Sequence, residues 1–252
     1  MIHRKTAADI TIMYQGGAIV GNILERMKEV VRPGITTSRI EAETDRMSRS
    51  MGIVAAFKGY RGYPSSICVS VNNEVVHGIP SDKRRLDAGD IVGLDFGAFF
   101  KGFYSDAAVT LPVGEPADEA KRLMKVTEEA LYKGIDAAVI GNRIGDISHA
   151  VQEYVESNGY SVVKVFVGHG IGRSLHEEPQ VPNFGDPGWG VRLKEGMTLA
   201  IEPMVNAGED QVHVLDDGWT AVTADGSLSA HYEHTVAITA NGPRILTLAR
   251  KG

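Results

Sequence analysis

Two aspartates that flank a predicted hairpin are the residues of this chain best suited to chemistry. Asp95 and Asp106 lie eleven positions apart, and the apolar runs 91–99 and 103–110 predict two strands joined by a turn at 100–102. A turn centred between residues 100 and 101 would place Asp95 directly opposite Asp106, with Cβ atoms about 4.5–5.5 Å apart. Two buried carboxylates at that distance repel each other unless a cation lies between them. The spacing therefore predicts a metal site.

The second half of the chain repeats this arrangement. A turn glycine, a short apolar strand and a carboxylate six residues after the glycine occur twice, ending at Asp95 and at Glu202. A carboxylate that opens an apolar strand also occurs twice, at Asp106 and at Glu233. Because both carboxylates recur in the same order, the sequence predicts a duplicated unit in which each half contributes one pair. Charges next to apolar strands rarely lack a partner, which supports a shared cation site.

Three histidines could act with these carboxylates. His169 lies between glycines in the segment GHGIG at the end of a predicted strand, where glycines let other groups approach closely. His176 follows in LHEEP, and His77 precedes a Gly-Ile-Pro turn. A glycine-rich loop after a strand could instead bind phosphate, but this spacing fits neither the dinucleotide motif nor the P-loop. His231, two residues before Glu233, is either a support for that carboxylate or an ordinary polar neighbour.

Composition excludes several classes of protein. The formal net charge of −6 over 252 residues argues against a general nucleic-acid binder with a basic stripe. No stretch approaches the ~20 continuous apolar residues that span a bilayer, and the first residues hold no apolar signal core. The single cysteine, Cys68, excludes an internal disulfide. We therefore expect a soluble cytoplasmic protein without a membrane partner.

The elements that must position these residues alternate helices with strands. Thr6 to Asp9 predicts a capping box at the start of a helix, which the Pro-Gly pair at 33–34 would end. Apolar residues at helical spacing continue through this segment. No linker separates the two halves, so we expect one pseudo-symmetric α+β domain. The patterns predict helices over about 6–31, 37–52, 118–139 and 145–158, and strands over 68–76 and 160–167 besides the hairpin.

Long motifs around these residues resemble a known family, the type I methionine aminopeptidases. They are FKGYRGYPSSICVSVNNEVVHGIP from residue 57, VGHGIGRSLHEEPQVPNFG from 167, GMTLAIEPMV from 196 and DGWTAVTADGSLSAHYEHT from 217. The resemblance covers nearly the whole chain. It implies the α+β pita-bread fold, in which two pseudo-symmetric αβ halves share a curved antiparallel sheet covered by helices. It also implies a single metallopeptidase catalytic domain over 1–252, with halves at approximately 1–112 and 113–252.

Two divalent metal ions per chain follow from this resemblance. Asp95 would hold one ion, Asp106 and Glu233 would bridge both, and His169 with Glu202 would complete the other. Oxygen-rich ligation with one imidazole suits Co, Mn, Fe or Zn, so the identity of the metal does not follow.

The implied reaction is hydrolytic removal of an N-terminal methionine by a metal-bridging water. The resemblance implies that Glu202 accepts the proton of this water and delivers it toward the leaving amine. His176 would stabilise the oxyanion, and His77 would contact the scissile amide.

A methionine pocket is implied by five further positions, which could otherwise be ordinary core residues. A thioether contacts aromatic rings favourably, by roughly 0.3–1.5 kcal/mol. Leu175 stands where some relatives carry phenylalanine. Cys68 would contact the substrate rather than act as a nucleophile. The five residues are Tyr60, Tyr63, Cys68, Leu175 and Trp219.

The implied substrates are peptides and nascent proteins that begin with methionine and have a small second residue. A short bacterial-style enzyme that acts as a monomer, with transient ribosome contact, would fit this task. The loop 206–219 argues against docking to the ribosome through that segment, because it carries acidic residues where bacterial relatives often place lysines. These are Glu209, Asp210, Asp216 and Asp217.

Two alternatives stay open at this point. A proline-specific peptidase or a creatinase-like hydrolase shares the fold, but such enzymes generally carry an additional N-terminal domain that we expect to be lacking here. A non-catalytic binding module would keep the fold without metals. The intact set of five ligand positions argues against that second alternative.

Overall fold

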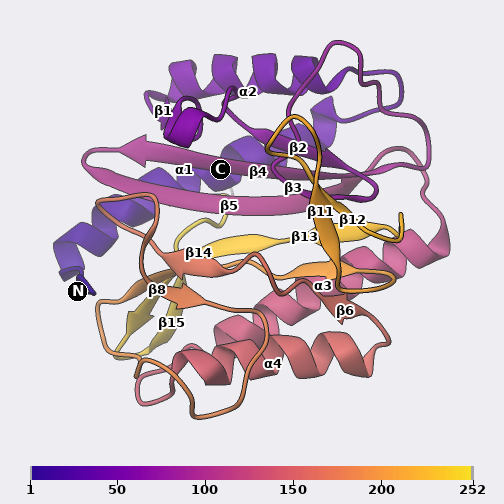
Figure 1. Ribbon diagram of the computed structural model, residues 1–252. Helices are drawn as coiled ribbons and strands as arrows, with labels where there is room; N and C mark the ends of the chain where they lie inside the picture. Colours follow the sequence, from indigo (N-terminus) through magenta and orange to yellow (C-terminus); the bar gives the residue numbers. More distant parts are fainter. Residues whose placement is uncertain (1, 251–252) are drawn as a thin grey trace.

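The computed structural model describes residues 2–250, and within them nine strands form one curved antiparallel sheet (Figure 1). The α+β architecture expected from the sequence is confirmed. Two three-stranded sheets accompany the large one. The large sheet has the spatial order β1 (Val54–Ala55), β4 (Ile91–Phe100), β5 (Phe103–Pro112), β14 (Glu233–Thr239), β9 (Thr198–Ile201), β7 (Gly168–Gly170) and β8 (Glu177–Val181); β2 (Cys68–Val71) pairs with β4, and β15 (Gly242–Ile245) with β14.

Four helices pack on this sheet, two from each half of the chain. They are α1 (Ala7–Val30), α2 (Thr37–Met51), α3 (Asp118–Ala137) and α4 (Ile144–Ser157). Helix α1 packs against β4 and β5, while α3 packs against β9 and β14. The predicted capping box is confirmed: the Thr6 side chain accepts a hydrogen bond from the Asp9 amide, and Asp9 accepts one from the Thr6 amide. None of the described helices is long and apolar enough to cross a membrane.

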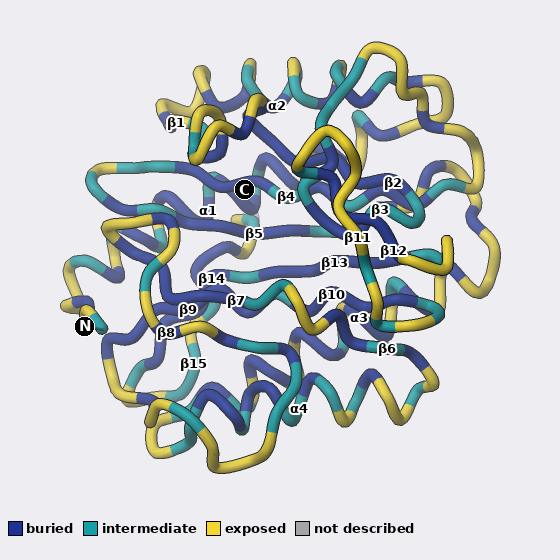
Figure 2. The backbone as a smooth tube through the Cα atoms, in the orientation of Figure 1, coloured by how far each residue is buried: buried dark blue, intermediate teal, exposed yellow. Residues whose placement is uncertain are grey.

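The order of strands in the large sheet reflects the repeat expected from the sequence. The hairpin of β4 and β5 lies beside β14 and β9, and β5 pairs with β14 at the junction of the two halves. In the first half, β4 begins after Gly89 and pairs with β5, which carries Asp106 near its start. In the second half, β9 begins after Gly196 and pairs with β14, which begins at Glu233. The buried residues of α1 and α2 pack on the first pair and those of α3 and α4 mainly on the second, which leaves the strands dark blue in Figure 2.

The register predicted for the β4–β5 hairpin is wrong by two residues. Asp95 pairs with Ala108, and Asp106 pairs with Gly97, so the two aspartates are diagonal neighbours on one face. The cause is the position of the turn, which consists of Lys101 and Gly102 with φ angles of 48° and 92°. Two successive positive φ angles make the tight turn that matches the twist of the flanking strands. The carboxylates still lie within reach of each other, as diagonal partners do.

Two predicted strands are shorter than the sequence indicated. The segment 68–76 divides at Asn72, whose φ of 57° turns the chain between β2 and β3. Within the segment 160–167 only β6 (Ser161–Val162) is a strand. Strand β6 belongs to a small sheet and β7 to the large one, so the residues between them cross from one sheet to the other. The first small sheet contains β6 (Ser161–Val162), β10 (Met204–Asn206) and β13 (Ser229–His231); the second contains β3 (Glu74–Val76), β11 (Val212–Val214) and β12 (Ala221–Thr223).

Helix α1 contacts the C-terminal segment through glycines that leave no room for a side chain. A Cβ added at Gly17 would lie 2.5 Å from the carbonyl oxygen of Leu246, and one at Gly21 would lie 2.3 Å from that of Thr247. Both distances are far below van der Waals contact, and the obstructing atoms belong to the backbone. The two glycines therefore allow the segment 246–249 to lie directly on the helix.

We expect Gly21→Ala to lower the free energy of unfolding by about 1–3 kcal/mol, because overpacking outweighs the higher helix propensity of alanine. The matched control is Gln15→Ala at an exposed position of the same helix, which should change stability by less than about 0.5 kcal/mol. Urea unfolding of both variants would measure the difference. Equal stability of Gly21→Ala and the parent protein would contradict the close approach.

Candidate functional site

Five neighbouring strands of the large sheet each supply one residue of the predicted metal site. Asp95 lies on β4, Asp106 on β5, Glu233 on β14, Glu202 directly after β9, and His169 on β7. These strands are consecutive in the order of the sheet. Residues from both halves of the chain therefore come together on one face because their strands are hydrogen-bonded neighbours.

Distances confirm that these side chains converge. Ligand-type atoms of Asp106, His169 and Glu233 all lie within 4.8 Å of one another. His169 Nε2 is 3.5 Å from Glu202 Oε1. Asp95 and Glu233 both pair with Ala108 of β5, one from each side, so they lie in one row across three strands.

Burial raises the pKa values of all four carboxyl groups, and repulsion by neighbouring carboxylates adds to this for Asp95, Glu202 and Glu233. Desolvation is the largest cause in each case; it raises the pKa of Asp106 to about 7. For Asp95 the charges of Asp106 and Glu202 add to the effect, and for Glu233 all three other carboxylates add. One oxygen of each carboxylate is buried without a hydrogen-bond partner among residues 2–250. Such groups are rarely left uncompensated in native proteins, so this donor set fits divalent cations.

His169 is held in the form that suits a metal ligand. Its Nδ1 lies 2.9 Å from the carbonyl oxygen of Gly170, and because a carbonyl can only accept, Nδ1 carries the proton. Nε2 then presents its lone pair toward Glu202. Burial lowers the pKa of His169 to about 4, which keeps the ring neutral. A hydrogen bond that fixes the tautomer in this way is typical of histidines that bind metals.

His176 lies beside His169 and is oriented by Tyr60. The two imidazole centroids are 4.1 Å apart, and the His176 ring stacks on Tyr60 at 5.2 Å and 15°. Nδ1 of His176 and the Tyr60 hydroxyl are 2.9 Å apart. When the hydroxyl donates, Nε2 of His176 carries the proton and can donate it to a ligand. His176 is exposed to solvent at the cavity, but partial desolvation by its neighbours, followed by the charge of His169, lowers its pKa below the usual value.

The loop that carries His176 is fixed by a buried ion pair with the N-terminal segment. Lys5 Nζ lies 2.6 Å from Glu177 Oε2, with side chains 5% and 9% exposed. Glu177 also accepts hydrogen bonds from the amides of Arg173 and Ser174. A buried charge loses hydration, so removing either partner would leave the other uncompensated. The pair therefore ties residues 172–177 to the segment that precedes α1.

His77 follows β3 in the left-handed region, with φ of 62°. Its ring contacts Phe166 and Trp219 edge to face, at centroid distances of 5.4 and 6.3 Å. Burial lowers its pKa. The unusual backbone angle and the aromatic contacts together hold this imidazole at the cavity, where a neutral ring can donate or accept a hydrogen bond.

The predicted methionine-pocket residues form the apolar part of the same cavity. Tyr63, Cys68 and Leu175 are buried, and the Tyr63 ring meets Trp219 edge to face at 5.1 Å. The Tyr63 hydroxyl donates a hydrogen bond to the Gly78 carbonyl at 2.9 Å. This bond satisfies the hydroxyl, and the Tyr63 ring lines the cavity. Burial and the charge of Asp95 raise the pKa of the Cys68 thiol. A thiol that stays protonated is a poor nucleophile, so Cys68 offers a soft contact surface.

One cavity of about 140 Å³ brings together all twelve residues that the sequence predicted for the site. Two further residues line it, Phe57 and Arg61, and sequence reasoning missed both. Both lie within the motif that begins at residue 57, so the segment was identified but not these two positions. His231 does not line this cavity; burial lowers its pKa to about 3, and its Nε2 has no partner within the described chain. A supporting role for His231 stays a prediction.

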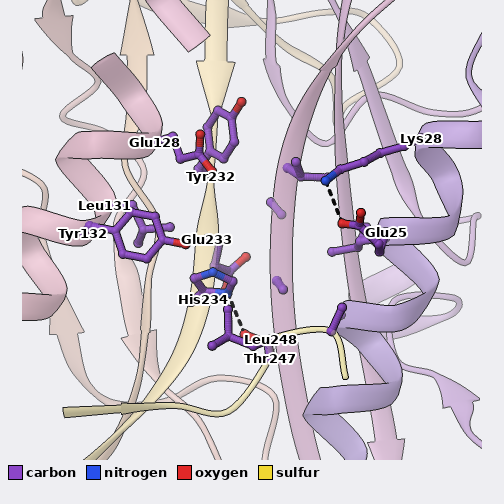
Figure 3. A pocket seen from close by; sticks show the side chains of 16 residues that line it. Glu25, Lys28, Glu128, Leu131, Tyr132, Tyr232, Glu233, His234, Thr247 and Leu248 are labelled. Carbon is purple, nitrogen blue, oxygen red and sulfur yellow. Dashed lines mark hydrogen bonds and ion pairs between the residues drawn. The ribbon is translucent and has the colours of Figure 1, made fainter. Parts of the chain in front are cut away.

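A second cavity of about 220 Å³ lies on the helix side of the sheet, between α1 and α3 (Figure 3). Glu233 borders both cavities, whereas His234, the next residue of β14, borders only this one and bonds to Thr247 through Nδ1 at 2.8 Å. The charged groups of its α1 wall, Glu25 and Lys28, form an ion pair with each other. Successive side chains of a strand point to opposite faces of the sheet, so His234 faces this second cavity while the carboxylate cluster lies on the other face. The second cavity contains no comparable group of buried anions among the described residues.

Comparison with known proteins agrees with this arrangement. Residues 11–240 match the model of metallopeptidase family M24. The chain is 54% identical over 250 residues to a methionine aminopeptidase of Clostridium perfringens, covering 99% of this chain and 100% of the relative. It is 51% identical to methionine aminopeptidase 1 of Bacillus subtilis, covering 98% and 99%.

Solved structures agree with the fold. The crystal structure of a methionine aminopeptidase from Thermotoga maritima is 50% identical and superposes with a TM-score of 0.97, covering 98% of this chain and 100% of that one. An Xaa-Pro dipeptidase from Bacillus anthracis is 24% identical with a TM-score of 0.79; this chain covers 63% of it, and the likeness shows the fold alone. The pita-bread fold expected from the sequence is confirmed. This chain belongs to metallopeptidase family M24 and, within it, to the type I methionine aminopeptidases.

Proposed function

We propose that this chain removes the N-terminal methionine from peptides and nascent proteins, with preference for a small second residue. One observation carries the proposal: a single small cavity joins five candidate metal-ligand side chains, three of them buried and two half-buried, to an apolar, aromatic-lined pocket. The metal-ligand side chains suit amide hydrolysis, and the aromatic-lined pocket suits a thioether side chain. The names of the relatives support the same reaction.

In this proposal the site would hold two divalent cations. The residues that would hold them are Asp95, Asp106, His169, Glu202 and Glu233. The four carboxylates offset the charge of two such ions. When bound, the ions polarise the scissile carbonyl and lower the pKa of the attacking water. The donor set suits Co, Mn, Fe or Zn.

Glu202 moves the proton. Its Oε1 lies in the row of carboxylates, buried and without a hydrogen-bond partner among the described residues, so it is free to take a proton from water. Without cations, burial and the charge of Asp106 raise the pKa of this carboxyl. Glu202 then passes the proton to the amine nitrogen that leaves.

His176 and His77 bind the reacting amide. The Tyr60 hydroxyl, by donating to Nδ1, leaves Nε2–H of His176 directed at the carbonyl oxygen as negative charge develops there. His77 contacts the scissile amide. Both imidazoles line the same small cavity of about 140 Å³, which supports a small second residue.

The methionine side chain enters the buried end of the cavity. Tyr63, Cys68, Leu175 and Trp219 surround it, and Tyr60 closes the side next to His176. Because Tyr63, Cys68 and Leu175 are buried and the carboxylates line the same cavity, the free amine of the substrate is bound there. The substrate can therefore enter only by its N-terminus, as an exopeptidase requires.

The whole chain acts as one catalytic domain with halves at about 1–112 and 113–252. Action on nascent proteins would place the enzyme in the cytoplasm, as a monomer in transient contact with the ribosome. The acidic loop before Trp219 does not serve that contact. Asp210 pairs with Lys164 at 2.7 Å, and Asp217 accepts three hydrogen bonds from Trp219 and Thr220, so these carboxylates hold the loop itself.

The function is tested by peptide assays with the metal-loaded protein. We expect cleavage of Met-Ala-Ser between the first two residues, no cleavage of Xaa-Pro dipeptides, and loss of turnover when a chelator removes the metal. Readdition of Mn, Fe, Co or Zn should restore turnover with at least one ion, which also identifies the metals that the site accepts. Cleavage of Xaa-Pro but not of Met-Ala-Ser would favour a dipeptidase instead, and failure on both would favour a binding module.

Replacing Asp106 by Asn should stabilise the metal-free protein. The raised pKa means that the folded state holds the Asp106 proton more tightly than the unfolded chain, so metal-free stability is lost as pH rises from about 4 through 7. At pH 8 we expect D106N to raise the metal-free Tm by about 4–8 °C, the shift that ~2 kcal/mol produces in a chain of this size. Thermal unfolding with and without metal measures the effect.

The same scans contain the control. Added metal should stabilise the parent protein more at pH 7 than at pH 5, since the carboxylates must lose their protons to bind it, and should stabilise D106N far less. A D106N variant that is less stable than the parent without metal would contradict the repulsive cluster.

Replacing His176 by Ala should lower kcat about 10²–10³-fold, because a donor to the developing oxyanion is lost, and should change KM only a few-fold. His149→Ala, on the exposed face of α4, is the matched control and should leave both constants unchanged. Steady-state kinetics on Met-Ala-Ser separates the two constants. A tenfold rise in KM with unchanged kcat would instead assign His176 to substrate binding alone.

A further inference from the structure

Arg61 lies at the apex of a tight loop on the rim of the cavity. Backbone hydrogen bonds close this loop, from the Gly59 amide to the Tyr63 carbonyl at 2.8 Å and from the Tyr63 amide to the Tyr60 carbonyl at 2.9 Å. Arg61 is exposed and lines the cavity, whereas Tyr63, two residues later, is buried inside it. The loop therefore presents one residue to the pocket and another to the opening.

The backbone of Arg61 has a conformation that its side chain makes unfavourable. Its φ of 51° and ψ of 20° lie in the left-handed region, inside the short helical turn η1 (Tyr60–Gly62). Glycine would adopt these angles without penalty, and a long side chain does not. Strain of this kind concentrates at functional positions, where the surrounding structure holds it. A bulky cation at a position that favours glycine points to a use for the side chain.

The guanidinium group has no carboxylate partner within residues 2–250. Arg173 contacts Asp9 at 3.7 Å and Arg39 pairs with Glu43 at 2.8 Å, but Arg61 forms no ion pair within the described chain. Its guanidinium carbon lies 5.5 Å above the Tyr60 ring, which holds the group by a cation–π contact. Its N–H donors are therefore free for a planar acceptor such as a carboxylate.

The part of a bound peptide that follows the scissile bond extends out of the cavity past the Arg61 guanidinium. The methionine side chain fills the closed end, and the scissile amide lies at His176, whose ring stacks on Tyr60. The residues after the scissile bond have to pass through the opening, where Arg61 covers a face of that same Tyr60 ring. Asp217, which lies two residues before the cavity residue Trp219, is already saturated by hydrogen bonds from its own loop.

We propose that Arg61 is a specificity-determining residue that binds the carboxylate of an acidic third residue in the substrate. This rests on the proposed removal of methionine. With methionine in the pocket and a small second residue in the cavity beside His77 and His176, the third residue is the first whose side chain is free to reach the rim. Arg61 supplies a cation held over an aromatic ring at that point, and bound metal ions would balance the carboxylates below it.

The test compares two peptides, Met-Ala-Asp-Ser and Met-Ala-Lys-Ser, both amidated at the C-terminus so that only one side chain differs in charge. With the metal-loaded protein, kcat/KM should be roughly tenfold higher for the Asp peptide, since attraction of one and repulsion of the other each contribute about threefold at an exposed site. Salt at about 0.5 M should reduce this ratio, because exposed charges are screened.

Three substitutions separate charge from backbone strain. R61K keeps the cation and should keep most of the ratio, while R61Q and R61G should bring it close to one. R61G also relieves the strained angle, so a role in the backbone alone would leave its ratio unchanged. The matched control is K58Q, which removes an exposed cation three residues away that does not line the cavity and should leave the ratio as in the parent.

The outcomes are distinct. A ratio that R61Q does not change, or that K58Q lowers equally, would overturn the contact with Arg61 while leaving the peptidase activity in place. Cleavage of neither peptide by the metal-loaded parent would overturn the proposed function, and this inference with it.

Discussion

Mutual repulsion among four buried carboxylates is the constraint on which the rest of this structure depends. Burial and neighbouring anions raise the pKa values of Asp95 and Glu233, and each carboxylate keeps one oxygen without a protein partner in the described chain. A fold could avoid such a cluster by moving one strand by one residue, which would turn its side chains to the other face. The sheet instead keeps all four on one face, and surrounds them with histidines that stay neutral. Bound cations, or protons on the carboxyl groups, relieve this repulsion.

The duplicated architecture accounts for the way so many anions reach one place. Each half supplies a pair of antiparallel strands with one carboxylate on each, and β5 joins β14 at the junction of the halves. The helices of each half cover the opposite face. Alternation along β14 then directs Glu233 to the carboxylate cluster and His234 to the hollow between α1 and α3, so one sheet separates two environments only one residue apart.

Sequence alone predicted the convergence because it follows from pattern: carboxylates beside apolar strands are costly to bury, and their recurrence in the same order in both halves indicates shared cations. Sequence failed where the outcome depends on a single backbone angle or on the choice of sheet. The register of the hairpin depends on a positive φ at Lys101, a residue type with no preference for that region. The short β6 reflects a crossing between two sheets, which periodicity within 160–167 cannot reveal. Arg61 was missed for the first reason, since an exposed arginine in a loop is ordinary until its φ is known.

The site thus divides into an interior set by charge balance and a rim that is free to vary. Inside, the carboxylates and His169 form a donor set that cations would compensate, and Lys5 and Glu177, which fix the His176 loop, compensate each other. Compensated charges exert little field beyond a few ångströms, because their contributions cancel. Arg61, which forms no ion pair within residues 2–250, then acts on the substrate as it passes the opening. Selection among substrates by the residues beyond methionine therefore belongs to the loop around Arg61, while the chemistry belongs to the sheet.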